Sequence, residues 1–269
     1  SRAVRSGGNP NLKPEEADTT SFGLVYSPSS VEGLNVSIDY WNIDIENEIT
    51  TVPLDKLLKT CYDTPSLSGS ACDAITRRAD GAIIEVQGGS INIGYSKLEG
   101  IDYEIDYKFD AKSIVSDLDG SFTVSAYINQ WLERNEVTDP AKPEDTFVDY
   151  KGGYFYPDWI ANVSLGYSAD NWGVTLRTNI RDKSVADPDF NHELANYEEA
   201  YPDGNGVVSH IKRFDFYSYW NLSDQTQVRF GIRNLLDEEP PRKTALFGGN
   251  YGISDAIGRT FNLGFSTQL

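Results

Sequence analysis

The last eleven residues of the chain, Arg259–Leu269, read Arg-Thr-Phe-Asn-Leu-Gly-Phe-Ser-Thr-Gln-Leu. Apolar residues at one parity (Phe261, Leu263, Phe265 and Leu269) alternate with polar or small residues at the other. Because successive side chains of a strand point to opposite faces, this stretch predicts a strand with one apolar and one polar face. A half-buried strand of a soluble sandwich shows the same alternation, so its repetition along the chain decides between the two architectures.

The two-sided pattern recurs along the chain and is clearest in Ile101–Phe109. There, aromatic and aliphatic residues alternate with Asp102, Glu104, Asp106 and Lys108. A charged face opposite an apolar face fits a strand between a water-filled lumen and lipid, whereas a solvent-facing strand of a soluble sheet is the alternative. The repeated pattern predicts about nine strands, at residues 20–26, 34–45, 101–109, 122–128, 159–167, 172–181, 213–222, 228–233 and 261–269.

Short and long connections alternate between these strands. The short ones are residues 28–33, 110–120, 169–171 and 223–225, and the long ones are about 50–90, 133–156, 184–209 and 237–258. Outer-membrane barrels place short turns in the periplasm and long loops outside the cell, so we predict an all-β transmembrane antiparallel β-barrel. An odd number of antiparallel strands cannot close in lipid, so the remaining barrel strands are expected from elsewhere in the same protein.

Composition agrees with a membrane barrel. The chain is 12% aromatic, yet its mean hydropathy is −0.44, which suits a barrel that is apolar outside and wet inside. The sequence has no run of 18 apolar residues, so it predicts no transmembrane helix. Its polar start does not resemble a signal peptide. The absence of Met indicates an internal or processed piece of a longer protein, and the net charge of −18 argues against a nucleic-acid partner.

Two cysteines, Cys61 and Cys72, lie in the long segment 50–90. With no histidine nearby they make a poor zinc site, so a disulfide that closes a short loop is the better interpretation. That bond implies an oxidising compartment. Just before it, the spacing of Leu54, Leu57 and Leu58 predicts a short helix that ends at Tyr62.

The sequence contains no Gly-x-Ser-x-Gly, His-Glu-x-x-His or P-loop motif, so we expect neither an enzyme nor a cofactor or metal site. His192 and His210, the two histidines, are interpreted as solvated loop residues rather than ligand contacts. Carboxylates on the polar parity suggest an acid–base pair, but a hydrated inner wall that also carries several arginines is the preferred interpretation. These carboxylates are Asp39, Asp102, Glu104 and Asp106.

Tyrosines in the long segments are the candidate substrate-binding residues. They either stack against a ligand or pack the loops together. The five candidates are Tyr154, Tyr156, Tyr197, Tyr201 and Tyr251.

Short motifs resemble one known family. Gly8–Glu15 reads Gly-Asn-Pro-Asn-Leu-Lys-Pro-Glu, like a segment of TonB-dependent receptors, and Ile38–Trp41 and Gly100–Tyr103 resemble strand motifs of the same family. Val228–Asp237 is close to the family's V-x-NLFD, and Gly258–Phe261 resembles the GRTF that opens its last strand. These matches follow the family's order over nearly the whole chain.

The resemblance implies a 22-stranded barrel occluded by an N-terminal plug. Residues 1–269 are similar to about the last nine strands, and the plug, the TonB box and the first strands are not in this chain. It also implies active uptake of a scarce nutrient (siderophore, oligosaccharide or similar) across the bacterial outer membrane. TonB supplies the energy through the plug, and lipid and lipopolysaccharide surround the wall. A passive porin and a structural or adhesive barrel are the alternatives.

The two ends of the chain depart from the family pattern. Ser1–Arg5 resembles the end of a preceding strand, which in the family leads into a long loop before the Gly8–Glu15 motif. Here only Ser6 and Gly7 intervene, so either this loop is short or residues are missing. The family's last residue is usually Phe, whereas this chain stops at Leu269.

Overall fold

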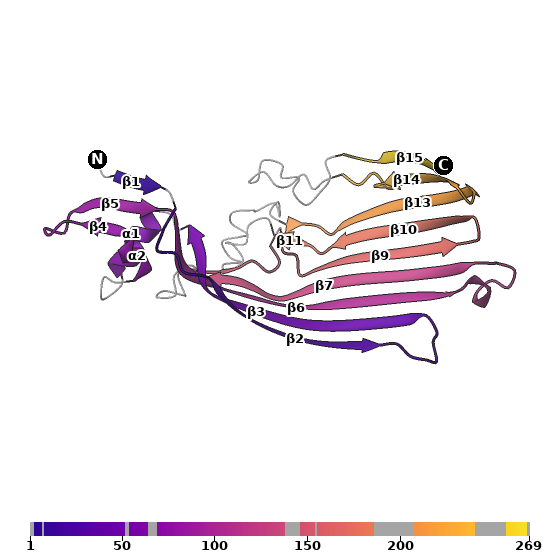
Figure 1. Ribbon diagram of the computed structural model, residues 1–269, viewed down its shortest axis with the longest axis horizontal. Coiled ribbons are helices and arrows are strands. Elements are labelled where there is room, and N and C mark those ends of the chain that lie inside the picture. The colour runs from indigo at the N-terminus through magenta and orange to yellow at the C-terminus, as the bar shows by residue number, and fades with distance from the viewer. Residues whose placement is uncertain are drawn as a thin grey trace. The chain divides into compact units, whose positions relative to one another are not determined.

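The computed structural model describes residues 3–6, 8–51, 54–63, 69–137, 146–153, 155–185, 207–239 and 257–267. Its main feature is one antiparallel sheet of long strands (Figure 1). Each strand pairs with the next one along the chain, in the order β15-β14-β13-β10-β9-β7-β6-β3-β2, and the short β8 (Phe147–Asp149) lies beside β7. The strands are β2 (Glu16–Tyr26), β3 (Leu34–Thr51), β6 (Ser90–Asp110), β7 (Ser121–Val137), β9 (Trp159–Ser168), β10 (Trp172–Arg181), β13 (Ile211–Ser223), β14 (Thr226–Arg233) and β15 (Thr260–Thr267). The nine predicted strands and their antiparallel arrangement are confirmed.

The strand register places apolar residues in rows across six strands. One row crosses from β7 to β15 through Val124, Leu165, Leu176, Phe216, Ile232 and Phe261. The neighbouring row contains Phe122, Tyr167, Val174, Ser218, Phe230 and Leu263. We call the surface formed by these rows the apolar face. A slip of one residue would send every side chain of a strand to the other side, so the rows fix the register.

The opposite surface, which we call the polar face, carries the charged and small residues. Ser125, Ser164, Arg177 and Asp215 form one of its rows. The even-numbered residues of β6 belong to it as well, because Ser125 Oγ donates to Asp106 Oδ1 at 2.6 Å. The neutral groups Ser125, Tyr127 and Asn129 thus donate hydrogen bonds to two carboxylates of this face, Asp106 and Asp102, which agrees with a polar wall.

Three strands run farther than the sequence pattern predicts. β3 continues to Thr51, β6 begins at Ser90 and β7 continues to Val137, so the loop predicted to start at Glu133 is wrong there. The alternation of apolar and polar residues stops before these strands end. Backbone pairing continues beyond that point, and polar side-chain contacts accompany it. One of these is the 2.5 Å ion pair between Lys97 Nζ and Glu133 Oε2. Periodicity therefore reports the apolar face of a strand and not its full length.

The chain divides into two compact units. Unit 1 contains Ser1–Thr20, Asn42–Glu99 and Glu133–Tyr150, and unit 2 contains Ser21–Trp41, Gly100–Leu132 and Lys151–Leu269. Unit 2 holds the rows described above and the short turns. It also contains the 3-10 helix Ala111–Ser113 and the small pair of β11 (Ser184–Val185) with β12 (Val207–Val208).

Unit 1 contains a small folded element that we call the disulfide subdomain. It consists of β1 (Ala3–Ser6), α1 (Leu54–Asp63), α2 (Ser70–Asp73), β4 (Ile75–Arg77) and β5 (Ile83–Gly88). α1 confirms the predicted helix. The apolar core is formed by Leu57, Cys61, Ala71, Ile75, Val86 and Ile91.

The start of the chain joins this subdomain. Ala3–Ser6 pairs in parallel with β5, which is antiparallel to β4. A strand in a parallel pair does not continue an antiparallel barrel wall. The described residues Ala3–Ser6 are therefore not the end of a preceding barrel strand, although Ser1–Arg5 resembles one. Among the described residues no helix is long and apolar enough to span a bilayer.

Candidate functional site

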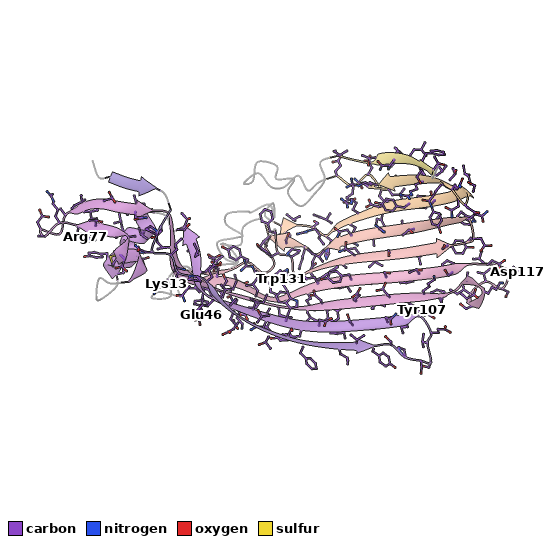
Figure 2. The ribbon with its side chains drawn as sticks, in the orientation of Figure 1. Lys13, Glu46, Arg77, Tyr107, Asp117 and Trp131 are labelled. Carbon is purple, nitrogen blue, oxygen red and sulfur yellow. A yellow bond between two sulfur atoms is a disulfide. The ribbon has the colours of Figure 1, made fainter. Side chains whose placement is uncertain are left out.

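Three aromatic rings gather on the polar face within unit 2. Trp41 of β3 contacts Trp131 of β7 with ring centroids 5.2 Å apart, and Trp131 contacts Tyr156 at 5.9 Å. The planes of both pairs are nearly perpendicular, at 86° and 90°. We call these three residues the aromatic cluster; Figure 2 labels Trp131.

Backbone contacts position the three residues of the cluster. Trp41 lies against Gly100 of β6, where a Cβ atom would stand only 2.4 Å from Trp41 Cζ2. The amide of Trp131 donates to the carbonyl of Asp158 at 2.9 Å. Tyr156 closes a tight turn in which its amide donates to Gly153 O at 3.0 Å. Any side chain at residue 100 would displace the indole, so glycine is required for this contact.

Polar groups lie beside the aromatic cluster. Asp102 Oδ1 accepts hydrogen bonds from Asn129 Nδ2 at 2.7 Å and from the Tyr127 hydroxyl at 3.2 Å. Asn129 and Tyr127 precede Trp131 on the same parity of β7, so this trio and the cluster share one face. In the described part of the chain, neither the Trp41 nor the Trp131 indole N–H has a hydrogen-bond acceptor. The site therefore combines ring surfaces with unused donors and a carboxylate.

Only one of the predicted substrate-binding tyrosines can be placed. Tyr156 is half-buried against Trp131. The other four, Tyr154, Tyr197, Tyr201 and Tyr251, lie outside the described residues, and a substrate role for all five stays a prediction. The sequence analysis did not single out Trp41 and Trp131 as candidate binding residues. The signal that could have found them is a tryptophan at a strand position where the neighbouring residues of the same face are polar.

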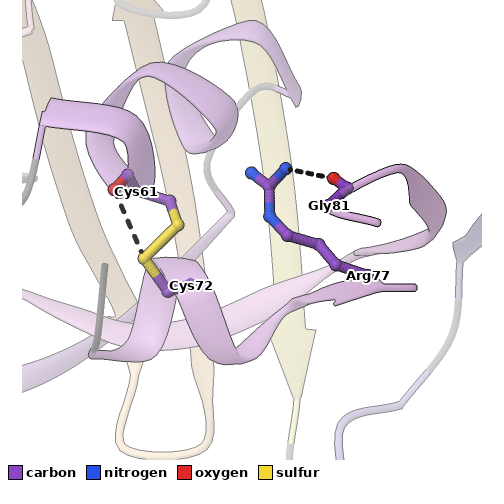
Figure 3. The surroundings of a disulfide bond; sticks show 4 residues. All are labelled: Cys61, Cys72, Arg77 and Gly81. Carbon is purple, nitrogen blue, oxygen red and sulfur yellow. Dashed lines mark hydrogen bonds between the residues drawn. A yellow bond between two sulfur atoms is a disulfide. The ribbon is translucent and has the colours of Figure 1, made fainter. Parts of the chain in front are cut away.

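The disulfide predicted from the sequence is present (Figure 3). The Cα atoms of Cys61 and Cys72 are 4.7 Å apart, and the bond crosslinks α1 to α2. Cys61 is buried in the core of the disulfide subdomain. Figure 3 also shows Arg77, whose Nη1 donates to Gly81 O at 3.2 Å across the turn between β4 and β5.

Histidines do not form a metal site in the described structure. His210 Nε2 lies 2.8 Å from Asp182 Oδ1, and its side chain is 48% exposed, so this loop residue contacts both a carboxylate and solvent. His192 lies outside the described residues. Within the part of the chain that is described, no group of His, Cys, Asp and Glu side chains is arranged to hold a metal ion.

An aromatic belt crosses the apolar face close to the short turns. Each ring of this belt contacts the next one, with centroids 4.6 to 5.7 Å apart, in the order Tyr107, Phe109, Phe122, Tyr167 and Trp172. The Tyr167 hydroxyl, at the edge of this belt, donates to the carbonyl of Asp119 in a short turn at 2.5 Å. Rings with a polar tip at the end of an apolar band mark the boundary between lipid and water in membrane barrels.

A family model described as TonB dependent receptor-like, beta-barrel matches residues 1–235. The chain belongs to the TonB-dependent receptor family. This is a family of receptors and transporters of the bacterial outer membrane, which interact with TonB and bind small-molecule ligands. No curated protein sequence matches the chain.

Solved structures with the same fold include siderophore and iron receptors. A ferric enterobactin receptor of Pseudomonas aeruginosa is similar with a TM-score of 0.60 and 17% identity, over 98% of this chain and 33% of that one. The siderophore receptor PirA of Acinetobacter baumannii has a TM-score of 0.56 and 14% identity, over 97% and 33%. The FrpB iron transporter of Neisseria meningitidis has a TM-score of 0.57 and 12% identity, over 99% and 32%. The chain therefore spans about a third of each of these proteins, and the likeness establishes the fold.

The structure explains two of the family-like motifs, which meet in one contact. Asp237 Oδ1, at the end of the first motif, accepts a hydrogen bond from the amide of Arg259 at 2.7 Å, and a Cβ atom on Gly258 would lie 2.7 Å from that oxygen. Asn234 adopts a φ of 53° and binds the backbone of Glu238 through both ends of its amide. Asp215 Oδ1 accepts a hydrogen bond from the backbone N–H of Asn234 at 2.8 Å. We call the bond between Asp237 and Arg259 the motif clasp.

Proposed function

We propose that residues 1–269 form the C-terminal part of the wall of an outer-membrane transporter that takes up a scarce nutrient with energy from TonB. Lipid and lipopolysaccharide surround the apolar face, and the polar face lines the lumen. A plug domain and the remaining strands of the same protein complete the barrel. No chemical step is assigned to this chain.

The apolar face is the observation that carries this proposal. Its rows of large apolar side chains are exposed in the described structure; Phe261, Leu263 and Phe265 are 65%, 79% and 68% accessible. A single-layer sheet with one such face, bounded by an aromatic belt, is stable where lipid replaces the missing apolar contacts. The strands β2 and β15 pair on one side only among the described strands, so they are the places where further barrel strands would join.

Solute uptake in a deletion strain tests the proposal. Cells that lack the gene should lose accumulation of one scarce solute, and cells that lack TonB should lose it equally. Uptake that persists without TonB would indicate a passive porin instead. No change in the uptake of any solute would indicate a structural or adhesive barrel. Complementation with the intact gene is the control in both strains.

A further inference from the structure

We propose that the aromatic cluster binds the ring faces of an uncharged, hydroxyl-rich ligand, namely an oligosaccharide. This inference rests on the proposed function, since it names the class of solute that the transporter captures. It concerns Trp41, Trp131 and Tyr156 together with the neighbouring carboxylate of Asp102.

The position of the rings is the first argument. Trp41 and Trp131 follow polar residues at the same parity of their strands: Asn35, Ser37 and Asp39 precede Trp41 in β3, and Ser125, Tyr127 and Asn129 precede Trp131 in β7. An indole on a wet surface leaves apolar area in water unless something covers it, and covering that area is favourable. Both rings are only half-buried, so surface remains for a ligand to cover.

The rigidity of the rings is the second argument. Trp41 is held against Gly100, and Trp131 is fixed between Trp41 and Tyr156 by two perpendicular contacts. Rings that are already in place lose little conformational entropy when a ligand binds, which raises affinity.

The shape of the cluster favours a chain of sugar rings over a point charge. Trp41 contacts Trp131, and Trp131 contacts Tyr156, whereas Trp41 has no ring contact with Tyr156 in the described structure. The rings therefore form a row rather than the closed cage in which aromatic faces converge on one cation. A row of rings offers successive stacking positions to successive sugar units.

The polar groups beside the row match hydroxyl groups. The indole N–H groups of Trp41 and Trp131 are donors without an acceptor in the described part. Asp102 uses Oδ1 for Asn129 and Tyr127, and its Oδ2 has no described partner. A hydroxyl both donates and accepts, so one sugar can satisfy these groups together.

Charge argues against an anionic ligand such as an iron chelate. Asp102, Glu104 and Asp106 follow one another on the polar parity of β6, and like charges repel. The two basic side chains described next to Tyr156 are both engaged: Lys151 Nζ lies 3.3 Å from Asp158 Oδ1, and Arg181 Nη2 donates to the carbonyl of Phe155 at 3.5 Å. An uncharged ligand avoids this repulsion.

The test is binding of maltoheptaose or xylohexaose to the intact receptor in detergent, followed by tryptophan fluorescence and calorimetry. Trp131→Ala should weaken binding at least tenfold, and Trp131→Phe should retain an intermediate affinity. Gly100→Val should also weaken binding, because its side chain would meet Trp41 and the carbonyl of Gln130 and so displace the indole without removing a ring. Trp172→Ala is the matched control; it removes a tryptophan from the apolar face and should leave affinity unchanged.

Migration of unheated samples on gels confirms that each variant is folded. The site assignment is overturned if neither oligosaccharide binds, or if folded Trp131→Ala binds as well as the unaltered protein. It is also overturned if only an iron(III) catecholate or spermidine binds in a manner that depends on the cluster.

Binding in detergent does not require TonB, so the two proposals fail separately. Oligosaccharide binding without TonB-dependent uptake would overturn the proposed transport and leave the site standing. TonB-dependent uptake that is unchanged in Trp131→Ala would overturn the site and leave the transport standing.

Discussion

The main sheet and the disulfide subdomain use apolar residues in opposite ways. In the disulfide subdomain Leu57, Cys61 and Val86 are 2–3% exposed and form a core shared by helices and strands. In the sheet, Phe22 and Leu263 are 75% and 79% exposed. The difference shows that one part of the chain folds in water and the other part folds against lipid. The subdomain excludes water from its own interior, whereas the sheet depends on lipid against its apolar face.

The two regions should therefore fail under different changes. The sheet is held by backbone ladders and by the match between its apolar rows and the bilayer, so it is sensitive to missing strands and to charge on the apolar face. The disulfide subdomain is held by a small core and a crosslink, so it is sensitive to reduction.

The largest expected effect concerns the open sides of the sheet. Residues 1–269 expressed alone should not fold into a monomeric, heat-resistant barrel, because unpaired backbone groups are not tolerated in lipid. Gel migration of unheated detergent samples measures this, with the intact receptor as control. A heat-resistant barrel from this fragment would contradict the reading of the sheet as part of a larger wall.

A charge on the apolar face should have the next largest effect. Leu176→Arg should destabilise the folded intact receptor in lipid vesicles by about 2–4 kcal/mol, because the arginine would face the bilayer. Thr175→Arg, one residue away on the polar face, is the matched control and should cost little. Urea titrations of both variants give the comparison, and equal costs would mean that the two faces are assigned wrongly.

Loss of the disulfide should affect only the subdomain. Replacing Cys61 and Cys72 together by serine removes a crosslink worth about 3 kcal/mol in the chain-entropy model, less any strain. Limited proteolysis should then cut segment 50–90 faster, while barrel migration on gels stays unchanged. Weaker ligand binding would show that the crosslink preorganises a capture loop. Unchanged binding with faster cleavage would show that it protects the loop, and equal cleavage rates would contradict both roles.

The smallest expected effect is an exposed ion pair in a short turn. Lys112 Nζ lies 2.5 Å from Asp119 Oδ1, and the hydrogen bond to Asp119 raises the pKa of Lys112 above its ordinary value of 10.5. A lysine whose pKa is higher in the folded protein stabilises the fold at any pH below its ordinary pKa. This contribution disappears as the pH rises through the raised pKa of the folded state. Urea midpoints of the unaltered receptor and Lys112→Gln should differ slightly at pH 8 and converge as the pH rises past the raised pKa of Lys112. A gap that widens with pH would contradict this sign.

The sequence predicted the nine strands because lipid on one side and water on the other impose a period of two, as in Ile101–Phe109. It could not predict the ends of β3, β6 and β7, where pairing continues through polar contacts such as Lys97 with Glu133. β4 and β5 were missed because short strands in a small core lack a sustained alternation, and the resemblance indicated a strand at β1 but not its parallel pairing with β5.

The candidate site was predicted less well than the fold. The disulfide followed from two cysteines, but Trp41 and Trp131 are ninety residues apart and meet only through the register of the sheet. Contacts between distant strands depend on pairing that no local pattern contains.

Because of the motif clasp, the residues between Asp237 and Gly258 can be replaced by another loop. The hydrogen bond from the Arg259 amide to Asp237 joins the end of β14 to the start of β15 across 22 positions. Because the two ends are fixed to each other, the intervening residues can lengthen at a cost that grows only logarithmically. The sequence of this connection can thus change while β14 and β15 keep their pairing, and grafting of a foreign loop between Asp237 and Gly258 should be tolerated for the same reason.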